Sequence, residues 1–374
     1  MVLSPHALTV VLKEEACRLG FDLVGATPAV TPPGIGHFRQ WLADGFAGPM
    51  HFMADRAAAY EHPRHVLPGV RSLLMLAVAY RTAETVAPRP GQGVVARYAC
   101  GADYHDLIRQ RLHALADLHR RLVPGGAVRG VVDTAPLLER QFAQLAGLGW
   151  FGKNTTLLNQ RWGSWFVLAA LLSSETLAYD PPHESNHCGR CRRCLDACPT
   201  GALVAPYRLD ARRCISCLTI ELSEQMPAEL RPAVGQRVFG CDVCQEVCPW
   251  NRPVAMTTPT FLSPLGNDLV ELTELFSLDE AALVQRFQGT PLVRAGRRGM
   301  LRNAALALGN RPHPPAVSAL TRGLDDAEPL VRGACAWALG RYGDRDASAA
   351  LAARLAVETD PAVRREIEVA LAVR

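Results

Sequence analysis

Four cysteines in the segment CGRCRRCLDACPTGAL, residues 188–203, have a spacing that could bind iron. Their pattern is C-x2-C-x2-C-x3-C followed by proline, the run that bacterial ferredoxins use for [4Fe–4S] clusters. In such a run three thiolates bind one cluster and the fourth reaches a second one. Nine of the twelve cysteines lie between residues 188 and 248, and in a long chain such clustering favours redox chemistry over disulfides. The segment therefore predicts an electron-transfer site.

A second run, CDVCQEVCPW at residues 241–250, lacks the first cysteine of the pattern, because Val238 stands in its place. The missing thiolate has to come from ARRCISCLTIE, which offers Cys214 or Cys217. Exchange of the last cysteine between the runs predicts one cluster on Cys188, Cys191, Cys194 and Cys248, and another on Cys198, Cys241, Cys244 and one of Cys214 and Cys217. We expect the other three cysteines, Cys17, Cys100 and Cys335, to be small buried side chains.

The part of the chain before these cysteines alternates between helical and strand-like patterns. Helical periodicity is clear at residues 6–20 and 104–123, and apolar runs at 21–26, 72–80 and 128–132 are typical of strands. This alternation predicts an α/β domain over residues 1–180. Neither a dinucleotide-binding glycine motif nor a P-loop is present in the sequence.

The last part of the chain contains a repeat. LRNAALALGN begins at residue 301, VRGACAWALGR at 331 and VRREIEVALAVR at 363, each next to a second helical segment. Paired helices at this period predict a HEAT-like α-solenoid. The fold class is therefore α+β multidomain: an α/β domain at 1–180, a ferredoxin-like double [4Fe–4S] domain at 181–255, and a helical repeat domain at 256–374.

Charge and hydropathy restrict the partners. The net charge is +4, and no segment approaches the about 18 uncharged apolar residues that span a bilayer. We expect a cytoplasmic monomer that does not bind membranes. Residues 285–311 contain six arginines and no acidic residue, which fits either a solvated helix face or a phosphate-binding patch. The candidates for nucleic-acid contact are Arg294, Arg297, Arg298 and Arg302.

Several motifs in order along the chain resemble one known family. They are RYACGADYHDLI, VDTAPLLER, GWFGKNT, the first cysteine run with PTGAL, LDARRCIS, GCDVCQEVCPWN and LRNAALALGN. Together they resemble epoxyqueuosine reductases over essentially the whole chain. The resemblance implies two-electron removal of the epoxide oxygen from epoxyqueuosine at the tRNA wobble position, which gives queuosine. It also implies cobalamin in the α/β domain, two clusters that deliver electrons from an external donor, and a solenoid that helps to hold the tRNA anticodon stem-loop.

The same resemblance assigns roles to particular residues. Asp133 in VDTAP is implied to be the general acid, with a pKa raised by burial beside the corrin, although it could also cap the following helix. Asp103, Tyr104 and His105 are implied to lie near the substrate, although Asp103 could simply cap the helix at 104–123.

For the cofactor, an incomplete docking motif predicts base-off cobalamin without a histidine ligand. The docking pattern D-x-H-x-x-G begins at Asp103 but has Ile108 in place of the glycine. The candidate cobalamin contacts are Arg97, Lys153, Asn154, Ser164 and Trp165. The family commonly has an aromatic residue at position 217, which favours Cys214 as the eighth cluster ligand without settling the choice.

Two other functions fit parts of the sequence. A corrinoid iron–sulfur reductase of another substrate, similar to reductive dehalogenases, would use the same cofactors, but it has no need for a basic solenoid. A non-catalytic electron-transfer protein would use the clusters, but it leaves VDTAP and the α/β half unexplained.

Overall fold

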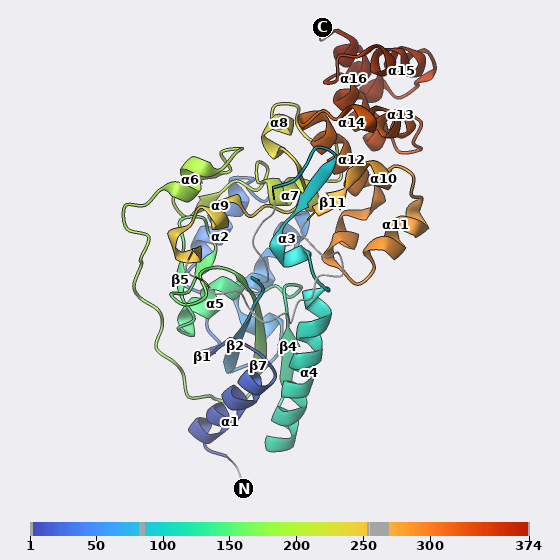
Figure 1. The fold of residues 1–374 in the computed structure, drawn as a ribbon. Helices are drawn as coiled ribbons and strands as arrows, with labels where there is room; N and C mark the ends of the chain where they lie inside the picture. The colour runs from blue at the N-terminus through green and yellow to red at the C-terminus, as the bar shows by residue number, and fades with distance from the viewer. Residues whose placement is uncertain (1–2, 82–86, 253, 255–268, 373–374) are drawn as a thin grey trace.

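The computed structural model describes residues 3–81, 87–252, 254 and 269–372. Three parts follow one another along the chain: an α/β layer structure, a loop-rich region around the cysteines, and a stack of helices at the C-terminus (Figure 1). This arrangement confirms the α+β multidomain fold class, whereas the domain boundaries stay a prediction.

An antiparallel four-stranded sheet forms the centre of the first part, in the order β1-β2-β7-β4. Its strands are β1 (Leu23–Pro28), β2 (Ser72–Ala79), β7 (Phe166–Ser173) and β4 (Val128–Val131). All eight residues of β2 are buried, as the apolar run at 72–80 predicts for a central strand. Strand β4 lies at one edge, so the segment that leaves it is open to one side of the molecule.

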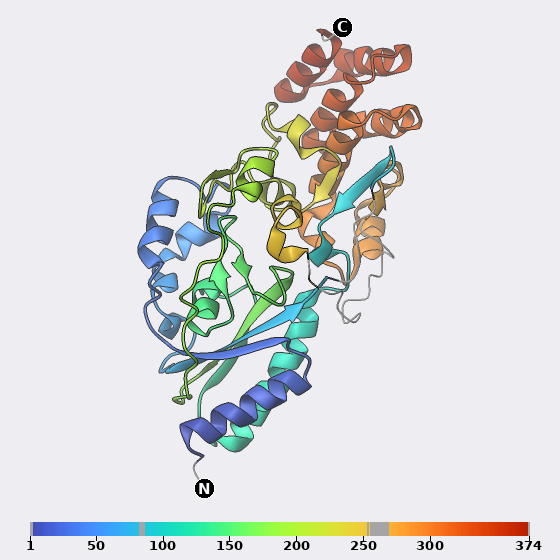
Figure 2. The same ribbon diagram turned by 60° about the vertical axis from the view of Figure 1, so that its left-hand side comes forward.

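Helices cover both faces of this sheet. On one face α1 (Pro5–Arg18) and α4 (Tyr104–Leu122) lie side by side (Figure 2), and their apolar residues pack on alternate residues of β2 such as Leu74 and Leu76. On the other face α5 (Glu139–Leu145) packs against Leu73 and Met75. Both faces of the sheet are therefore buried, and the helices predicted at 6–20 and 104–123 are confirmed.

Short elements complete this part. They are α2 (Ile35–Ala43), α3 (His51–Asp55), β5 (Trp150–Phe151), β6 (Leu157–Leu158) and the 3-10 helices η1 (Ala57–Glu61), η2 (Pro63–His65) and η3 (Arg97–Ala99).

The cysteine region consists mostly of short elements. They are α6 (Arg193–Ala197), β8 (Leu203–Ala205), β9 (Arg208–Leu209), α7 (Ile215–Ile220), α8 (Arg231–Val234), β10 (Arg237–Phe239), α9 (Val243–Glu246) and η4 (Pro249–Asn251). Strand β10 pairs with β3 (Gln92–Val95), which in turn pairs with β11 (Leu269–Glu271). This small sheet joins segments from all three predicted domains.

The C-terminal helices form the predicted solenoid. The three repeat segments are helices α12 (Gly296–Asn310), α14 (Pro329–Leu339) and α16 (Pro361–Ala372), and α12 and α16 both pack on α14. The remaining elements are α10 (Leu272–Leu275), α11 (Glu280–Phe287), η5 (Pro291–Ala295), η6 (Pro314–Ala316), α13 (Val317–Leu324) and α15 (Arg345–Val357). One continuous core extends from β3 to α16, so the solenoid is not an isolated module.

The cysteines outside the cluster region differ from one another. Cys100 and Cys335 are buried, as predicted, but Cys17 is exposed, so the prediction for Cys17 is wrong. It lies on α1 next to Ala16, which takes the core-facing position instead.

Candidate active site

Asp133 lies just beyond the C-terminal end of the edge strand β4, where the sequence predicts a turn. Its backbone has φ +57°, in the left-handed region that few non-glycine residues adopt. Its N–H donates to Glu139 Oε1 at 3.0 Å, and this bond holds the turn. Helix α5 begins six residues later with Leu138 as N-cap, so Asp133 does not cap it. The carboxyl is 60% exposed and therefore accessible to a substrate.

The N-terminus of α4 brings the other predicted residues to this carboxyl. Asp103 is the N-cap and accepts a hydrogen bond from the His105 backbone at 2.9 Å. Its Oδ1 is also 2.8 Å from His105 Nδ1, and His105 Nε2 is 3.3 Å from Asp133 Oδ2. The Tyr104 hydroxyl donates to the same Oδ2 at 3.0 Å. The structure thus joins all four predicted residues, and Asp103 both caps the helix and orients the imidazole.

The two hydrogen bonds of the imidazole restrict the positions of its protons. When Asp103 is ionised, the Nδ1–H of His105 donates to it. The hydrogen bond between Nε2 and Asp133 then contains one proton, which is carried either by the ring or by the carboxyl. Burial lowers the pKa of His105, but hydrogen bonds to Asp133 and Asp103 outweigh it and raise the pKa overall.

The pKa of Asp133 shifts in the direction opposite to the sequence prediction. The hydrogen bond from His105 holds the pKa of this carboxyl below its ordinary value, although burial acts to raise it. The hydrogen bonds from His105 and Tyr104 outweigh desolvation in this structure, and the raised pKa expected beside the corrin stays a prediction.

A second carboxyl, which sequence reasoning did not single out, lies next to this group. Desolvation and the nearby charge of Asp133 raise the pKa of Glu139 to about 8. Glu139 is thus protonated at neutral pH while it supports the Asp133 turn. Its position in VDTAPLLER, six residues after the aspartate, was the only sequence signal for it.

The cysteines of the two runs influence one another's thiol pKa values, but no three His, Cys, Asp or Glu side chains in the described part of the chain are arranged to hold a metal ion, so the two groups of four stay a prediction. In the first, burial raises the pKa of Cys194 to about 11, and the neighbouring thiols Cys248 and Cys188 add to the effect. Burial also raises the pKa of Cys248, with contributions from Cys188 and Cys191. Helices α6 and α9, which lie within the two runs, pack together. These interactions link Cys248 of the second run to cysteines of the first, as the predicted crossover requires.

Cys214 interacts with thiols of the second predicted group. Burial raises the pKa of Cys214, and Cys198 contributes; Cys241 and Cys244 are both affected by Cys214 in turn. Cys217 is on α7 and buried, and burial raises the pKa of its thiol to about 12. The charge effects of Cys198 on Cys214, and of Cys214 on Cys241 and Cys244, support Cys214 as the eighth thiolate, and the choice between Cys214 and Cys217 stays a prediction. Two sets of four thiols would match the donor set of two [4Fe–4S] clusters.

The predicted cofactor contacts have different surroundings. Lys153 Nζ donates to the carbonyls of Gly189 and Cys191 at 2.6 and 2.9 Å, so it supports the first cysteine loop. The Asn154 side chain hydrogen-bonds the Cys244 thiol and so reaches the second cysteine run. By contrast, Trp165 Nε1 is a buried polar atom that has no hydrogen-bond partner among the described residues. Buried polar groups normally have partners, so this atom fits a polar ligand such as cobalamin.

The other two contacts lie around the Trp165 ring. The Arg97 guanidinium stacks over this ring at 4.5 Å from its centroid. Ser164 Oγ donates to Gln245 Oε1 at 2.8 Å, and its backbone N–H donates to Asn251. Ser164 therefore connects β7 to the second cysteine run.

The basic segment of the solenoid is less exposed than its sequence indicates. Arg302 is fully buried and donates to the carbonyls of Leu218 and Glu224, so the expected contact with nucleic acid is wrong for this residue. It instead fastens α12 to the cysteine region.

The other arginines of this segment are exposed except for the half-buried Arg297, and three of them have acidic partners, the first being Arg286 with Glu274 at 3.0 Å. Arg294 pairs with Glu221 at 2.9 Å and Arg297 with Asp326 at 2.6 Å. Arg298 is exposed.

In the described part of the chain, no helix has both the length and the apolar composition needed to cross a membrane.

Comparisons with known proteins agree with this arrangement. Residues 61–134 match a family model described as epoxyqueuosine reductase QueG, DUF1730, residues 187–251 match a 4Fe-4S double cluster binding domain, and residues 292–372 match HEAT repeats. An epoxyqueuosine reductase of Pseudomonas aeruginosa is 44% identical over 347 residues, which cover 91% of this chain and 96% of that protein. The enzyme of Escherichia coli is 39% identical, with 89% of each chain covered.

Solved structures are similar over almost the full length. A crystal structure of epoxyqueuosine reductase with an epoxyqueuosine-modified tRNA-Tyr stem loop has a TM-score of 0.93, 31% identity and 99% coverage of both chains. A structure of the Bacillus subtilis enzyme, with its catalytic aspartate loop swung out of the active site, has a TM-score of 0.91 at 30% identity and covers 99% of this chain and 100% of that chain. The chain is an oxidoreductase that belongs to the epoxyqueuosine reductase family.

Proposed function

We propose that the protein reduces epoxyqueuosine to queuosine at the wobble position of tRNA, with cobalamin and two [4Fe–4S] clusters. The reaction takes up two electrons and two protons, breaks both C–O bonds of the epoxide, and yields an alkene and water. Family membership and the similar structure with a modified stem loop support this substrate.

The arrangement of Asp103, His105 and Asp133 is the observation that carries the proposal. The reaction consumes two protons, and the site contains two groups with raised pKa values, His105 and Glu139, that of Glu139 being about 8. Asp133 lies between these two groups and is the exposed member, so it is positioned to pass a proton to the epoxide oxygen. Tyr104 fixes the carboxylate by its bond to Oδ2.

Cobalamin would contact Trp165, whose buried Nε1 has no partner among the described residues, and Asn154, whose side chain lies at Cys244 of the second cysteine run. When bound, it supplies low-valent cobalt, a strong nucleophile and electron source. Base-off binding without a histidine is supported by His105, since both of its ring nitrogens are already engaged and its ring stacks on Tyr104 at 4.1 Å.

Further contacts and the cellular setting stay predictions. The exposed Arg298 and the partly neutralised Arg294 and Arg297 remain candidates for the tRNA anticodon stem-loop. The external electron donor, the monomeric state and the cytoplasmic location follow from the sequence interpretation only.

The proposal is tested with protein reconstituted with iron, sulfide and cobalamin, given a reductant and tRNA that carries epoxyqueuosine. Digestion and mass spectrometry should show a nucleoside lighter by one oxygen atom, and protein without cobalamin should give none. Absence of conversion by protein that carries both clusters and cobalamin would refute the proposal.

A further inference from the structure

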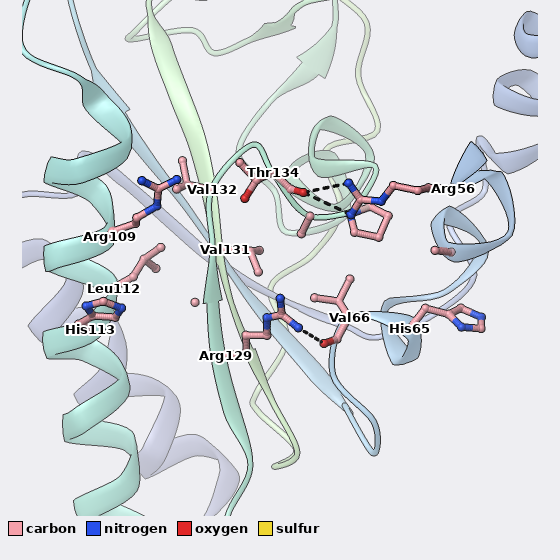
Figure 3. A pocket seen from close by; sticks show the side chains of 14 residues that line it. Arg56, His65, Val66, Arg109, Leu112, His113, Arg129, Val131, Val132 and Thr134 are labelled. Atoms are coloured by element: carbon pink, nitrogen blue, oxygen red, sulfur yellow. Dashed lines mark hydrogen bonds between the residues drawn. The ribbon is translucent and has the colours of Figure 1, made fainter. Parts of the chain in front are cut away.

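A basic pocket lies at the outer edge of the sheet, next to the turn that carries Asp133 (Figure 3). Its volume is ≈ 370 Å³, within the range of small-ligand sites. We name it the β4-edge pocket, and its cationic or titratable lining residues are Arg56, His65, Arg109, His113 and Arg129. None of the described residues that line it is acidic.

Three segments contribute these lining residues. Helix α4 contributes Arg109, Leu112 and His113, which share a helix face because they are three and four residues apart. Strand β4 contributes Arg129 and Val131 from one of its faces. The η1–η2 region closes the opposite side with Arg56 and His65 (Figure 3).

The guanidinium groups in the pocket retain donors for a ligand. Arg129 Nη1 donates to the Val66 carbonyl at 2.8 Å, and both Nη atoms of Arg56 are 3.3 Å from the Thr134 carbonyl. These partners are neutral, so they do not cancel the positive charge. Arg109 pairs with Asp106 at 3.2 Å on the exposed side of α4. Each arginine has five N–H donors, and three cations without an acidic lining residue favour an anionic ligand.

The pocket is connected to the candidate catalytic turn. Part of its wall comes from residues on either side of Asp133 in the sequence, namely Val132, Thr134, Ala135 and Pro136. Arg56 holds the carbonyl of the residue directly after Asp133. An anionic group bound here would therefore lie next to the substrate of Asp133. If that substrate is a modified nucleotide, the nearest anion is the phosphodiester of the same or the adjoining nucleotide.

We propose that the β4-edge pocket binds a phosphodiester of the anticodon loop beside the wobble nucleotide; this rests on the proposed function. The nucleotide tail of cobalamin is the other source of a phosphodiester. The lining residues include no cysteine and neither Asn154 nor Trp165, and this separation favours the RNA.

The test uses Arg109→Gln, Arg129→Gln and the double variant in the reconstituted protein, with fluorescence anisotropy of a labelled anticodon stem-loop over a salt series. Each lost phosphate contact should weaken RNA binding several-fold. It should also reduce the steepness of the plot of the logarithm of the association constant against the logarithm of the salt concentration by about 0.7. Arg120→Gln is the matched control, because Arg120 lies on the same helix, has the same kind of ion pair, with Asp117 at 2.6 Å, and is outside the pocket.

The outcomes separate the two proposals. If wild-type protein binds the RNA and both pocket variants behave like Arg120→Gln, the pocket proposal is overturned and the proposed function stands. If the variants instead lose affinity for cobalamin and bind RNA normally, the phosphodiester is that of the cofactor and the RNA assignment is wrong. Absence of RNA binding by the wild type would overturn both. Arg109→Gln alone is decisive if Arg129→Gln does not fold, because Arg109 is a surface residue.

Discussion

Replacement of Asp133 with asparagine removes the charge that keeps a proton on His105. In the wild type, His105 Nε2 is 3.3 Å from Asp133 Oδ2 and its pKa is raised by this carboxylate and Asp103. An asparagine amide would donate to Nε2, so the ring would become neutral and lose the stored proton. Because Glu139 keeps a second proton beside the turn, we expect turnover to fall by about 10²–10³-fold, in the lower part of the range for general acid–base catalysis. This equals about 2.7–4.1 kcal/mol in the activation free energy.

The assay is single-turnover conversion by pre-reduced protein, followed by mass spectrometry of the nucleosides. Asp117→Asn is the matched control, because Asp117 is an exposed carboxylate on α4, the helix that carries His105, and it pairs with Arg120 away from the site. Iron content and affinity for the stem-loop should stay unchanged in both variants. Turnover by Asp133→Asn that equals the wild-type value would refute the role of this carboxylate.

Three further predictions concern the cluster ligands, the pH profile and the solenoid. Cys214→Ser should lose one of the two clusters and about half of the iron that the double site holds, while Cys217→Ser keeps both; equal iron contents would contradict this. Asp103→Asn removes one of the carboxylates that raise the pKa of His105. Because turnover needs the His105 ring protonated, the rate of the variant should fall at a lower pH than that of the wild type. An identical pH–rate profile would contradict the role of His105 as a proton donor. Hydrogen bonds from buried arginines lower the pKa of Glu358 to about 2, so its stabilisation is present above the unfolded pKa of about 4.3 and is lost as the pH falls toward 2. Thermal melting of Glu358→Gln should therefore depend less on acid pH than that of the wild type, and parallel curves would exclude this contribution.

Local patterns were enough to predict most elements. The helix at 104–122, the strand at 72–79 and the three repeat helices follow from hydrophobic periodicity, which burial in the native fold preserves. The predicted grouping of the cysteines rests on fixed spacings, since three thiolates of one run must lie on one side of a cluster, and it stays a prediction.

The features that the sequence did not reveal depend on contacts between distant residues. The burial of Arg302 requires carbonyls about eighty residues earlier in the chain, and the acidic partner of Arg294 is Glu221, so a charge count within residues 285–311 could not detect either. The lowered pKa of Asp133 likewise depends on His105, which the fold brings to it from the start of α4.

The central claim is that the protein removes the epoxide oxygen and forms an alkene. Reduced, reconstituted protein is incubated with tRNA carrying epoxyqueuosine in deuterium oxide, and the isolated nucleoside is weighed after exchangeable deuterium has been washed out. The account predicts loss of one oxygen atom with no deuterium on carbon. A nucleoside that keeps its oxygen and gains two hydrogen isotopes, as in reductive ring opening to an alcohol, would contradict it.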